Sequence, residues 1–334
     1  MAEKIIVASG KGGAGKTSLA TGVALSLSQR GLRVLVMDFD IGQGYADFMI
    51  SGEYTSLYNW GDALKGNCDT REAVNSNGTV DVVAAPKKWD DSFTPLKIKT
   101  FICTIEKDYD YILFDSPAGV TGGFRLAAHC ADRAIIVSTP DEICTRAAAT
   151  ATDELIECGV DNIRLVINRF NKIPTTKGKY YNIDDVIDAV KAQLIGVVPE
   201  DKEISYASST GFVNLKDCPA KAAYGRIADR ICGTKVPLVI EKSKKEQTKS
   251  KAPLVVFLCI LFALLIAIAG IFTTDCIRCT RLEPPVFARF HEKTDGNTTR
   301  SDLFVYSVES EKQDGKIISS ELKIRDKVIV AAIT

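Results

Sequence analysis

The chain has 334 residues, of which 46% are hydrophobic and 25% are charged, and its 42 basic residues balance its 42 acidic residues. Such a composition is typical of globular protein and leaves room for one large domain and a smaller one. The net charge of zero argues against nucleic acid as a partner, because binding to phosphate backbones requires a basic surface. The N-terminal residues lead straight into a strand pattern, so we expect no cleavable signal peptide.

The first pattern in the chain is a strand, a glycine-rich turn and a helix. Residues 4–8 are apolar and β-branched, as in a buried strand, and residues 19–30 have apolar side chains at helical spacing. Between them, the sequence fits the phosphate-loop pattern Gly10-x-x-x-x-Gly15-Lys16-Thr17 at each fixed position. In such a loop, backbone N–H groups and the lysine bind phosphate oxygens, and the threonine hydroxyl binds Mg²⁺. A glycine-rich turn that binds nothing is disfavoured, because the loop, the lysine and the flanking elements all agree.

The loop also contains a second lysine, in the run Lys11-Gly12-Gly13-Ala14-Gly15-Lys16-Thr17-Ser18. Two lysines supply more positive charge than one triphosphate normally needs from a single subunit. This loop resembles the deviant Walker A motif of the MinD/ParA family. The resemblance implies ATP and Mg²⁺ as ligands of Lys11 to Ser18, and a homodimer in which Lys11 reaches across a nucleotide sandwich to the partner's ATP.

Residues 32–38 are predicted to form a second parallel strand, which ends in Asp38-Phe39-Asp40-Ile41-Gly42. Carboxylates at the carboxyl end of a parallel strand lie at the ligand edge of a doubly wound sheet, although a solvated strand end has the same composition. The segment is similar to switch I of the MinD family. That similarity implies that Asp38 helps to hold the metal and that Asp40, the third expected catalytic residue beside Lys11 and Lys16, positions the attacking water. Residues 43–47 depart from the family pattern.

The next stretch alternates short elements. We expect short helices around residues 58–64 and 70–74, a strand at 79–85 and a helix at 95–108. Trp60 and Trp89 lie in this stretch, and we interpret them as packing or rim aromatics.

Residues 111–115 form an apolar strand pattern that ends in Asp115 and continues as Ser116-Pro117-Ala118-Gly119. Its carboxylate satisfies the Walker B requirement for a group that binds Mg²⁺ across the sheet edge from Thr17. The segment resembles the MinD family's version of this site. Residues 119–123 would then be the switch II backbone.

Residues 134–232 continue the alternation of strands and helices, which predicts an α/β fold with a doubly wound, mostly parallel sheet. We expect strands at 134–139, 163–168 and 195–198 and helices at 141–158, 184–194 and 220–232. The resemblance implies that Asn168, Arg169 and the segment around Pro199 flank adenine, and an ordinary polar strand end is the alternative for the first two. The seven cysteines in this domain occur singly, so we expect small buried side chains in a reducing compartment.

A change of composition follows residue 234. Residues 235–251 form a basic linker, and residues 252–272 are 21 residues without a charge. At about 1.5 Å per residue this run spans roughly 31 Å, enough to cross a hydrocarbon core, whereas a buried core helix would be shorter and polar on one side. The lysines before it place the ATPase domain, residues 1–234, in the cytoplasm of a single-pass protein of the cell membrane.

Residues 273–334 are predicted to form a small extracytoplasmic, β-rich domain. Strand patterns at 303–308, 316–323 and 328–333 are separated by Asp314-Gly315 and Arg325-Asp326, which indicates a small antiparallel sheet. Cys276 and Cys279 favour a local disulfide over a metal site, because no second ligand pair exists.

The sequence therefore predicts a membrane-anchored, Mg²⁺-dependent ATPase similar to MinD and ParA, a dimerisation switch that positions or recruits an unknown protein partner at a division site, pilus or secretion machine. One alternative is an ATP-binding scaffold without significant turnover. The other is a bacterial tyrosine kinase of the same superfamily. It is disfavoured because its loop lacks an equivalent of Lys11, its span precedes the ATPase domain, and its tail is rich in tyrosine, whereas only Tyr306 follows the apolar run here.

Overall fold

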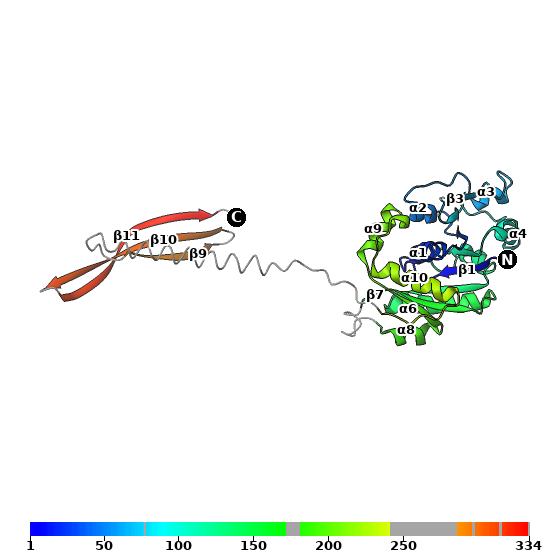
Figure 1. Cartoon of the computed structure of the whole chain (residues 1–334). Coiled ribbons are helices and arrows are strands. Elements are labelled where there is room, and N and C mark those ends of the chain that lie inside the picture. Colours follow the sequence, from blue (N-terminus) through cyan, green and yellow to red (C-terminus); the bar gives the residue numbers. More distant parts are fainter. Residues whose placement is uncertain (77, 172–180, 241–285, 296–297, 314–315, 333–334) are drawn as a thin grey trace. The chain divides into compact units, whose positions relative to one another are not determined.

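The computed structural model describes residues 1–76, 78–171 and 181–240 in full, and the backbone of three strands within residues 286–332. The chain divides into two units, Met1–Glu246 and Gln247–Thr334, each described by itself below (Figure 1). Residues 241–251 of the predicted linker and the whole predicted membrane span, residues 252–272, lie outside the described residues, as do Cys276 and Cys279. Among the residues that are described, no helix has both the length and the apolar character needed to cross a membrane.

The large unit alternates strands and helices along the chain. Its first half contains β1 (Glu3–Ala8), α1 (Lys16–Ser28), β2 (Val34–Asp38), α2 (Ala46–Ser51), α3 (Trp60–Leu64), β3 (Val74–Ser76), β4 (Asp81–Val83), α4 (Pro95–Ile105), the 3₁₀ helix η1 (Glu106–Asp108) and β5 (Tyr111–Asp115). Its second half contains α5 (Gly122–Ala128), β6 (Arg133–Ser138), α6 (Glu142–Glu157), β7 (Ile163–Phe170), α8 (Ile183–Val190), β8 (Gln193–Pro199), α9 (Lys202–Thr210), the 3₁₀ helix η2 (Phe212–Asn214) and α10 (Pro219–Ile231).

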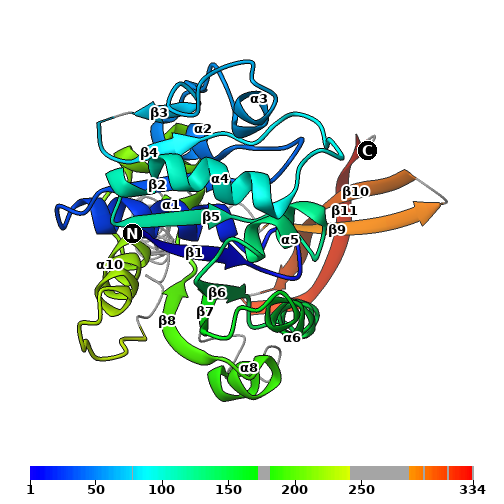
Figure 2. The same ribbon diagram turned by 90° about the vertical axis from the view of Figure 1, so that its right-hand side faces the viewer.

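The strands form one eight-stranded sheet in the order β3-β4-β2-β5-β1-β6-β7-β8 (Figure 2). Neighbouring strands are parallel except β3 and β4, which pair antiparallel at one edge. The predicted mostly parallel, doubly wound sheet is therefore confirmed. β1 lies between β5 and β6, and its successor β2 lies on the opposite side from β6. Such a reversal of strand order opens a crevice at the carboxyl ends of the strands, where ligands bind in folds of this type.

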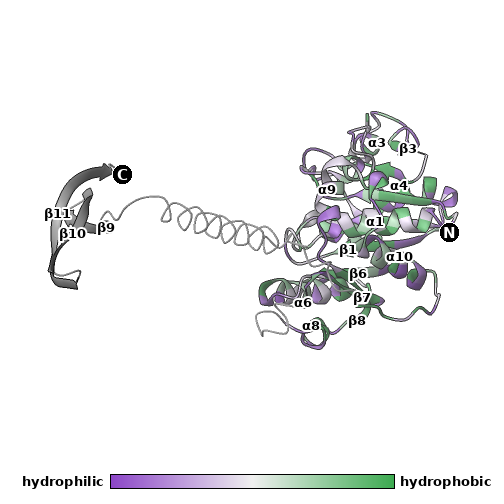
Figure 3. Ribbon diagram, turned by 60° about the vertical axis from the view of Figure 1, so that its left-hand side comes forward, coloured by the Kyte–Doolittle hydropathy of each residue, from purple (hydrophilic) through white to green (hydrophobic). Residues whose placement is uncertain are grey.

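Burial of both faces of the sheet explains why its strands are continuously apolar. In β1, Ile5 and Val7 pack in a cluster with α1, α2, α9 and α10, whereas Ile6 and Ala8 pack in a cluster with α4, α5, α6 and α8. Side chains alternate between the faces of a strand, so the central positions of a strand covered on both faces are apolar. The strands of this sheet are coloured mostly as hydrophobic in Figure 3, while the surrounding helices carry both colours.

Several expected elements differ from the structure. No helix occupies residues 70–74; this segment ends in the short edge strand β3, whose three residues are too few to give a periodic pattern. Helices α2, α5 and α9 were not expected, because at six, seven and nine residues they are too short to show a clear helical period. The cysteines are not uniformly buried, since Cys103 and Cys232 are exposed.

The smaller unit contains an antiparallel sheet in the order β11-β10-β9. The sequence predicted an antiparallel sheet here, although with different strand bounds. Its strands are β9 (Val286–Asp295), β10 (Thr298–Gln313) and β11 (Lys316–Ala332). The expected break at Arg325-Asp326 is wrong, because β11 is continuous there. Val305 pairs with Asp326 and Tyr306 pairs with Ile324, so Arg325 is the extra residue of a β-bulge.

Candidate phosphate and metal site

The loop that follows β1 ends at a helix N-terminus with no side-chain cap. Gly15 is the N-cap of α1, with φ 96°, and the first turn of α1 contains no acidic residue. The first N–H groups of a helix have no partner within the helix and carry partial positive charge. Because no side chain of this helix satisfies them, they are available to an anion.

Glycines are required at two positions of this loop by close neighbours. A Cβ at Gly10 would collide with the backbone carbonyl of Ala147 in α6, and a Cβ at Gly15 would collide with the side-chain amide of Asn168. The loop is therefore held between α6 and the end of β7. Gly12 and Gly13 are exposed, so the outer part of the loop lies open to a ligand, whereas Ala14 is buried.

Lys16 is a buried cation at the base of the loop. Only 8% of it is exposed, and its Nζ donates a hydrogen bond to Ser9 Oγ at 3.1 Å. Ser9 Oγ in turn donates to the carbonyl oxygen of Lys11 at 2.8 Å. Burial lowers the pKa of Lys16, and the nearby carboxylates of Asp115 and Asp40 partly oppose that effect. A bound polyanion would stabilise this ammonium group.

Two carboxylates end neighbouring strands beside the loop. Asp38 of β2 and Asp115 of β5 are paired in register, and each is 1% exposed. The Oδ1 atom of Asp38 accepts from the backbone N–H of Asp40 at 2.8 Å, and Oδ2 accepts from that of Ala46 at 3.1 Å. The Oδ1 atom of Asp115 is buried without a hydrogen-bond partner among the described residues.

The environment of this pair fits a divalent cation. Burial, followed by the charge of Asp115, raises the pKa of Asp38 well above its usual range, and burial raises the pKa of Asp115 to about 7 although Thr17 hydrogen-bonds to it. Two buried carboxylates that repel each other are destabilising unless protons or a cation neutralise them. Hard oxygen ligands of this kind suit Mg²⁺, so the predicted metal residues Thr17, Asp38 and Asp115 fit that ion together.

Asp40 and Lys11 lie at the rim of the site. Burial raises the pKa of the half-buried Asp40, while the charge of Lys16 lowers it. Lys11 is exposed, and its charge helps to lower the pKa of Asp141 at the start of α6. Ser18, in the first turn of α1, contacts the sulfur of Met49 through its hydroxyl at 3.9 Å.

The residues expected near the base occupy different places. Asn168 is 5% exposed, and its Nδ2 donates to the carbonyl oxygen of Ala14 at 2.8 Å, so it supports the phosphate loop. Arg169 is exposed and has a positive φ of 52°, whereas Pro199 is buried at the end of β8, where it pairs with Phe170. The contacts of these residues with a base stay predictions.

Sequence reasoning missed the contact of Trp60 with the site. The indole Nε1 of Trp60 donates to the carbonyl oxygen of Asp38 at 2.8 Å. The two residues are 22 positions apart and share no motif. Only the buried position of α3 beside β2 brings them together, and no spacing rule could have shown this contact.

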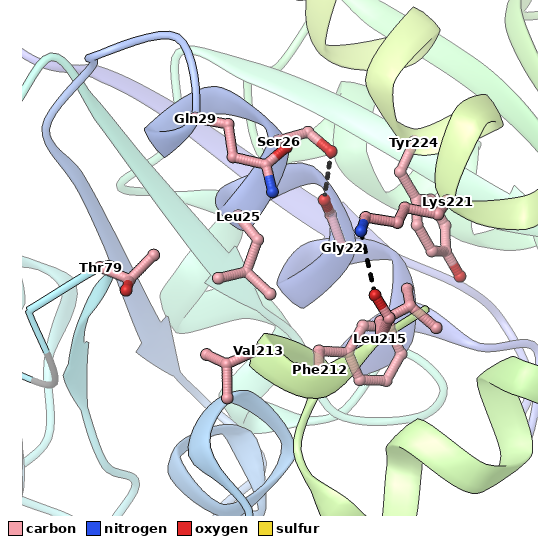
Figure 4. Close-up of a pocket in the computed structure, with 10 residues that line it drawn as sticks. All are labelled: Gly22, Leu25, Ser26, Gln29, Thr79, Phe212, Val213, Leu215, Lys221 and Tyr224. Carbon is pink, nitrogen blue, oxygen red and sulfur yellow. Dashed lines mark hydrogen bonds between the residues drawn. The ribbon is translucent and has the colours of Figure 1, made fainter. Parts of the chain in front are cut away.

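A separate cavity lies between α1, η2 and α10 (Figure 4). Its volume is about 110 Å³, and Lys221 at its wall donates to the carbonyl oxygen of Leu215 at 3.0 Å. Sites for nucleotide-sized ligands have volumes of roughly 300 Å³ or more. None of the residues predicted to bind phosphate or metal lines this cavity, so it is not the nucleotide site.

A phosphate loop with a buried lysine, beside two in-register carboxylates at the carboxyl edge of a parallel sheet, defines a P-loop nucleotide-binding protein. Residues 5–212 match the CobQ/CobB/MinD/ParA nucleotide binding domain, and the chain belongs to this family. Its MinD/ParA members are P-loop ATPases. The resemblance inferred from the loop is thereby confirmed, and the matched region does not extend to the predicted membrane span.

Individual relatives agree with this assignment. The septum site-determining proteins MinD of Bacillus subtilis and Helicobacter pylori are each 32% identical to the chain, over 73% of its length and 95% and 96% of theirs. Among solved structures, the MinC:MinD cell division protein complex of Aquifex aeolicus has a TM-score of 0.66 at 28% identity and covers 73% of this chain and 100% of its own. MinD of Pyrococcus horikoshii, complexed with Mg-ADP, shares the fold with a TM-score of 0.62 at 24% identity, over 69% of this chain and 96% of its own.

Proposed function

We propose that the chain is a membrane-anchored, MinD-like ATPase that dimerises around Mg²⁺-ATP and recruits a partner protein in that state. This proposal rests on the closeness of a buried cation, Lys16, to two buried carboxylates, Asp38 and Asp115. Burial destabilises the charged form of each of these groups when no ligand is bound. A triphosphate with its metal supplies both missing charges. The lysine would bind phosphate oxygens, and the carboxylates would bind the cation.

In this proposal, each residue of the site has a separate role in hydrolysis. Backbone N–H groups of the loop and Lys16 hold the phosphates, while Thr17, Asp38 and Asp115 hold Mg²⁺, which neutralises developing charge. Asp40 lies at the rim, with its backbone fixed by the side chain of Asp38, and it orients the attacking water. Phosphoryl transfer depends mainly on positioning and electrostatic stabilisation, so fixed geometry at this residue is catalytically useful.

Lys11 connects hydrolysis to dimerisation. It is exposed at the rim of the loop, next to the exposed Gly12 and Gly13, and among the residues that the structure describes no ion pair holds it within its own subunit. From the rim it reaches the phosphates of a second subunit across a nucleotide sandwich. Tethering both subunits to one membrane raises their effective concentration and favours this dimer without further contacts.

Residues 252–272 form the proposed anchor, with the ATPase domain in the cytoplasm and residues 273–334 outside. The support is the uncharged run of 21 residues preceded by lysines. We expect the full chain to stay with membranes after alkaline carbonate extraction, and protease added to spheroplasts to cleave only the C-terminal part. Release by carbonate, or protection of both parts, would contradict this anchor.

The ATPase is tested with three variants of the full chain. We expect Lys16→Ala to lose ATP binding, Asp40→Ala to bind ATP and dimerise without turnover, and Lys11→Ala to bind ATP without forming the dimer. Lys4→Ala is the matched control, because Lys4 is a part-buried lysine at the opposite end of β1, paired with Glu106 and Asp132. Its ATP affinity and turnover should equal those of the wild type.

The same measurements separate the ATPase from an ATP-binding scaffold. Wild-type protein that binds ATP and dimerises, but hydrolyses no faster than Asp40→Ala, would refute the ATPase and favour the scaffold. The partner is then sought by copurification with the Asp40→Ala variant, which holds the ATP state. Positioning of a division site, a pilus or a secretion machine is the class of process we propose for that partner.

A further inference from the structure

Both tryptophans of the chain belong to one aromatic cluster beside the phosphate and metal site. Trp60 is fully buried, and its indole N–H bonds the carbonyl oxygen of Asp38 at 2.8 Å. Its ring lies 5.7 Å from that of Phe39 and 4.7 Å from that of Phe93. Trp60 therefore touches switch I, residues 38–42, through both a hydrogen bond and a ring contact.

The other end of the cluster touches switch II, residues 119–123. The ring of Trp89 lies 6.2 Å from Phe93 and is 47% exposed. A Cβ at Gly122 would come within 2.7 Å of this ring, so Trp89 lies directly against the first residue of α5. Phe93 is the ring that both tryptophans share.

The segment that carries Trp89 and Phe93 also holds the backbone of switch I. The carbonyl oxygen of Pro86 accepts from the N–H of Gly42 at 3.0 Å, and that of Ala84 accepts from the N–H of Trp60 at 3.2 Å. Residues 84–93, between β4 and α4, are thus attached to both switches. A shift of either switch must move this segment or break one of these contacts, because packed interiors resist continuous deformation.

The hydrogen bond of Trp60 is placed where it affects the water-orienting residue. The carbonyl of Asp38 precedes Phe39, and the side chain of Asp38 bonds the N–H of Asp40. The turn from the metal-binding carboxylate to Asp40 is therefore fixed at two points, one of which is the indole. Without the indole, the carbonyl would be buried without this donor, a loss that typically destabilises the local geometry.

We propose that Trp60 is a positioning residue for hydrolysis, and that Trp60, Phe93 and Trp89 form an aromatic bridge that couples switch I to switch II. This inference rests on the proposed ATPase and adds residues outside its phosphate and metal ligands. If the cluster only packs the core, its loss would lower stability without a selective effect on turnover.

The test compares kcat and the Kd for ATP of the full chain in Trp60→Phe, Trp89→Leu and the double variant. Trp60→Phe keeps a ring and removes the N–H donor, and we expect kcat to fall about tenfold while Kd changes less than about threefold, since a lost buried hydrogen bond of this type corresponds to that factor. Trp89 is half exposed, so Trp89→Leu should fold normally, and we expect its kcat to fall about threefold. If the bridge is real, the double variant loses less than the product of the two factors.

Tyr109→Phe is the matched control. It removes the hydrogen bond of another buried aromatic residue, from Tyr109 Oη to Asp81 at 2.7 Å, away from both switches. We expect it to lower the melting temperature while kcat stays at the wild-type value.

Each outcome decides the inference. A normal kcat in Trp60→Phe, an equal loss in Tyr109→Phe, or multiplicative losses in the double variant would overturn it. Wild-type protein that binds ATP without hydrolysis would overturn both the ATPase and the positioning role. Wild-type turnover together with unaffected Trp60→Phe turnover would overturn the positioning role alone.

Discussion

Replacement of the buried carboxylate of Asp115 is expected to stabilise the ligand-free protein and to destroy its response to Mg²⁺-ATP. The carboxylate is 1% exposed, and burial raises its pKa from 3.8 to about 7. A group that is protonated more readily in the folded state stabilises that state at low pH. This contribution is complete below pH 3.8 and is lost as the pH rises through about 7.

The size of the effect follows from the same shift. At roughly 1.4 kcal/mol for each pH unit, the change between an unfolded value of 3.8 and a folded value of about 7 corresponds to roughly 4 kcal/mol of unfolding free energy. Asp115→Asn removes the charge and keeps the shape. It also removes the repulsion between the carboxylates of Asp115 and Asp38, which in part raises the pKa of Asp38.

The assay is urea unfolding of the full chain without nucleotide or metal at pH 4, 6 and 8. We expect Asp115→Asn to match the wild type at pH 4 and to be several kcal/mol more stable at pH 8. Mg²⁺-ATP should then stabilise the wild type and leave the variant nearly unchanged. Asp110→Asn is the control. Hydrogen bonds from Arg33 lower the pKa of that carboxyl, so its loss should reduce stability at pH 8, which is opposite to the effect expected for Asp115→Asn. The same pH dependence in wild type and Asp115→Asn would refute the reasoning.

Four glycine substitutions test the packing of the site, of α1 and of α10. Gly15→Ala should lower the ATP affinity measured by calorimetry at least a hundredfold, because its Cβ would meet Asn168 and its φ is 96°. Gly31→Ala is the control and should keep the affinity, because Gly31 has a similar φ of 80° but open space around it. Gly22→Ala should lower the unfolding free energy by about 1–3 kcal/mol, because its Cβ would collide with the ring of Tyr224 between α1 and α10. Gly225→Ala, whose Cβ would meet only Arg30 at 3.8 Å, should stabilise α10 by about 0.5–1 kcal/mol in the same denaturation assay.

The features predicted best from the sequence are those that depend on local pattern. Tyr111–Asp115 forms a strand with the expected bounds, because four consecutive apolar or aromatic residues followed by Asp115 are typical of a buried strand that ends at the ligand edge. The phosphate loop could be predicted because glycines and lysines stand at fixed spacing around one strand-to-helix turn. Chemistry that depends on adjacent residues is therefore visible in the sequence.

Features that depend on distant contacts were not predictable. The hydrogen bond from the Asn168 amide to the carbonyl of Ala14 joins residues 154 positions apart, and no sequence pattern indicated it. Trp60 was interpreted only as a packing or rim aromatic, although its N–H bonds Asp38. The strand β11 shows the same limit, because the charged pair Arg325-Asp326 suggested a turn, whereas a bulge accommodates it within one strand.

The segment that departs from the family pattern, residues 43–47, is attached directly to the proposed metal site. The N–H of Ala46, at the start of α2, bonds the Oδ2 atom of Asp38 at 3.1 Å. On the outer side of this segment Tyr45 is 50% exposed, and Tyr54, which stacks on Phe48 at 5.0 Å, is 65% exposed. A metal ion bound to Asp38 would draw electron density from the oxygen that accepts this bond, and would thereby weaken the bond to α2. Metal binding at Asp38 is therefore expected to change the backbone at the start of α2, close to the exposed ring of Tyr45.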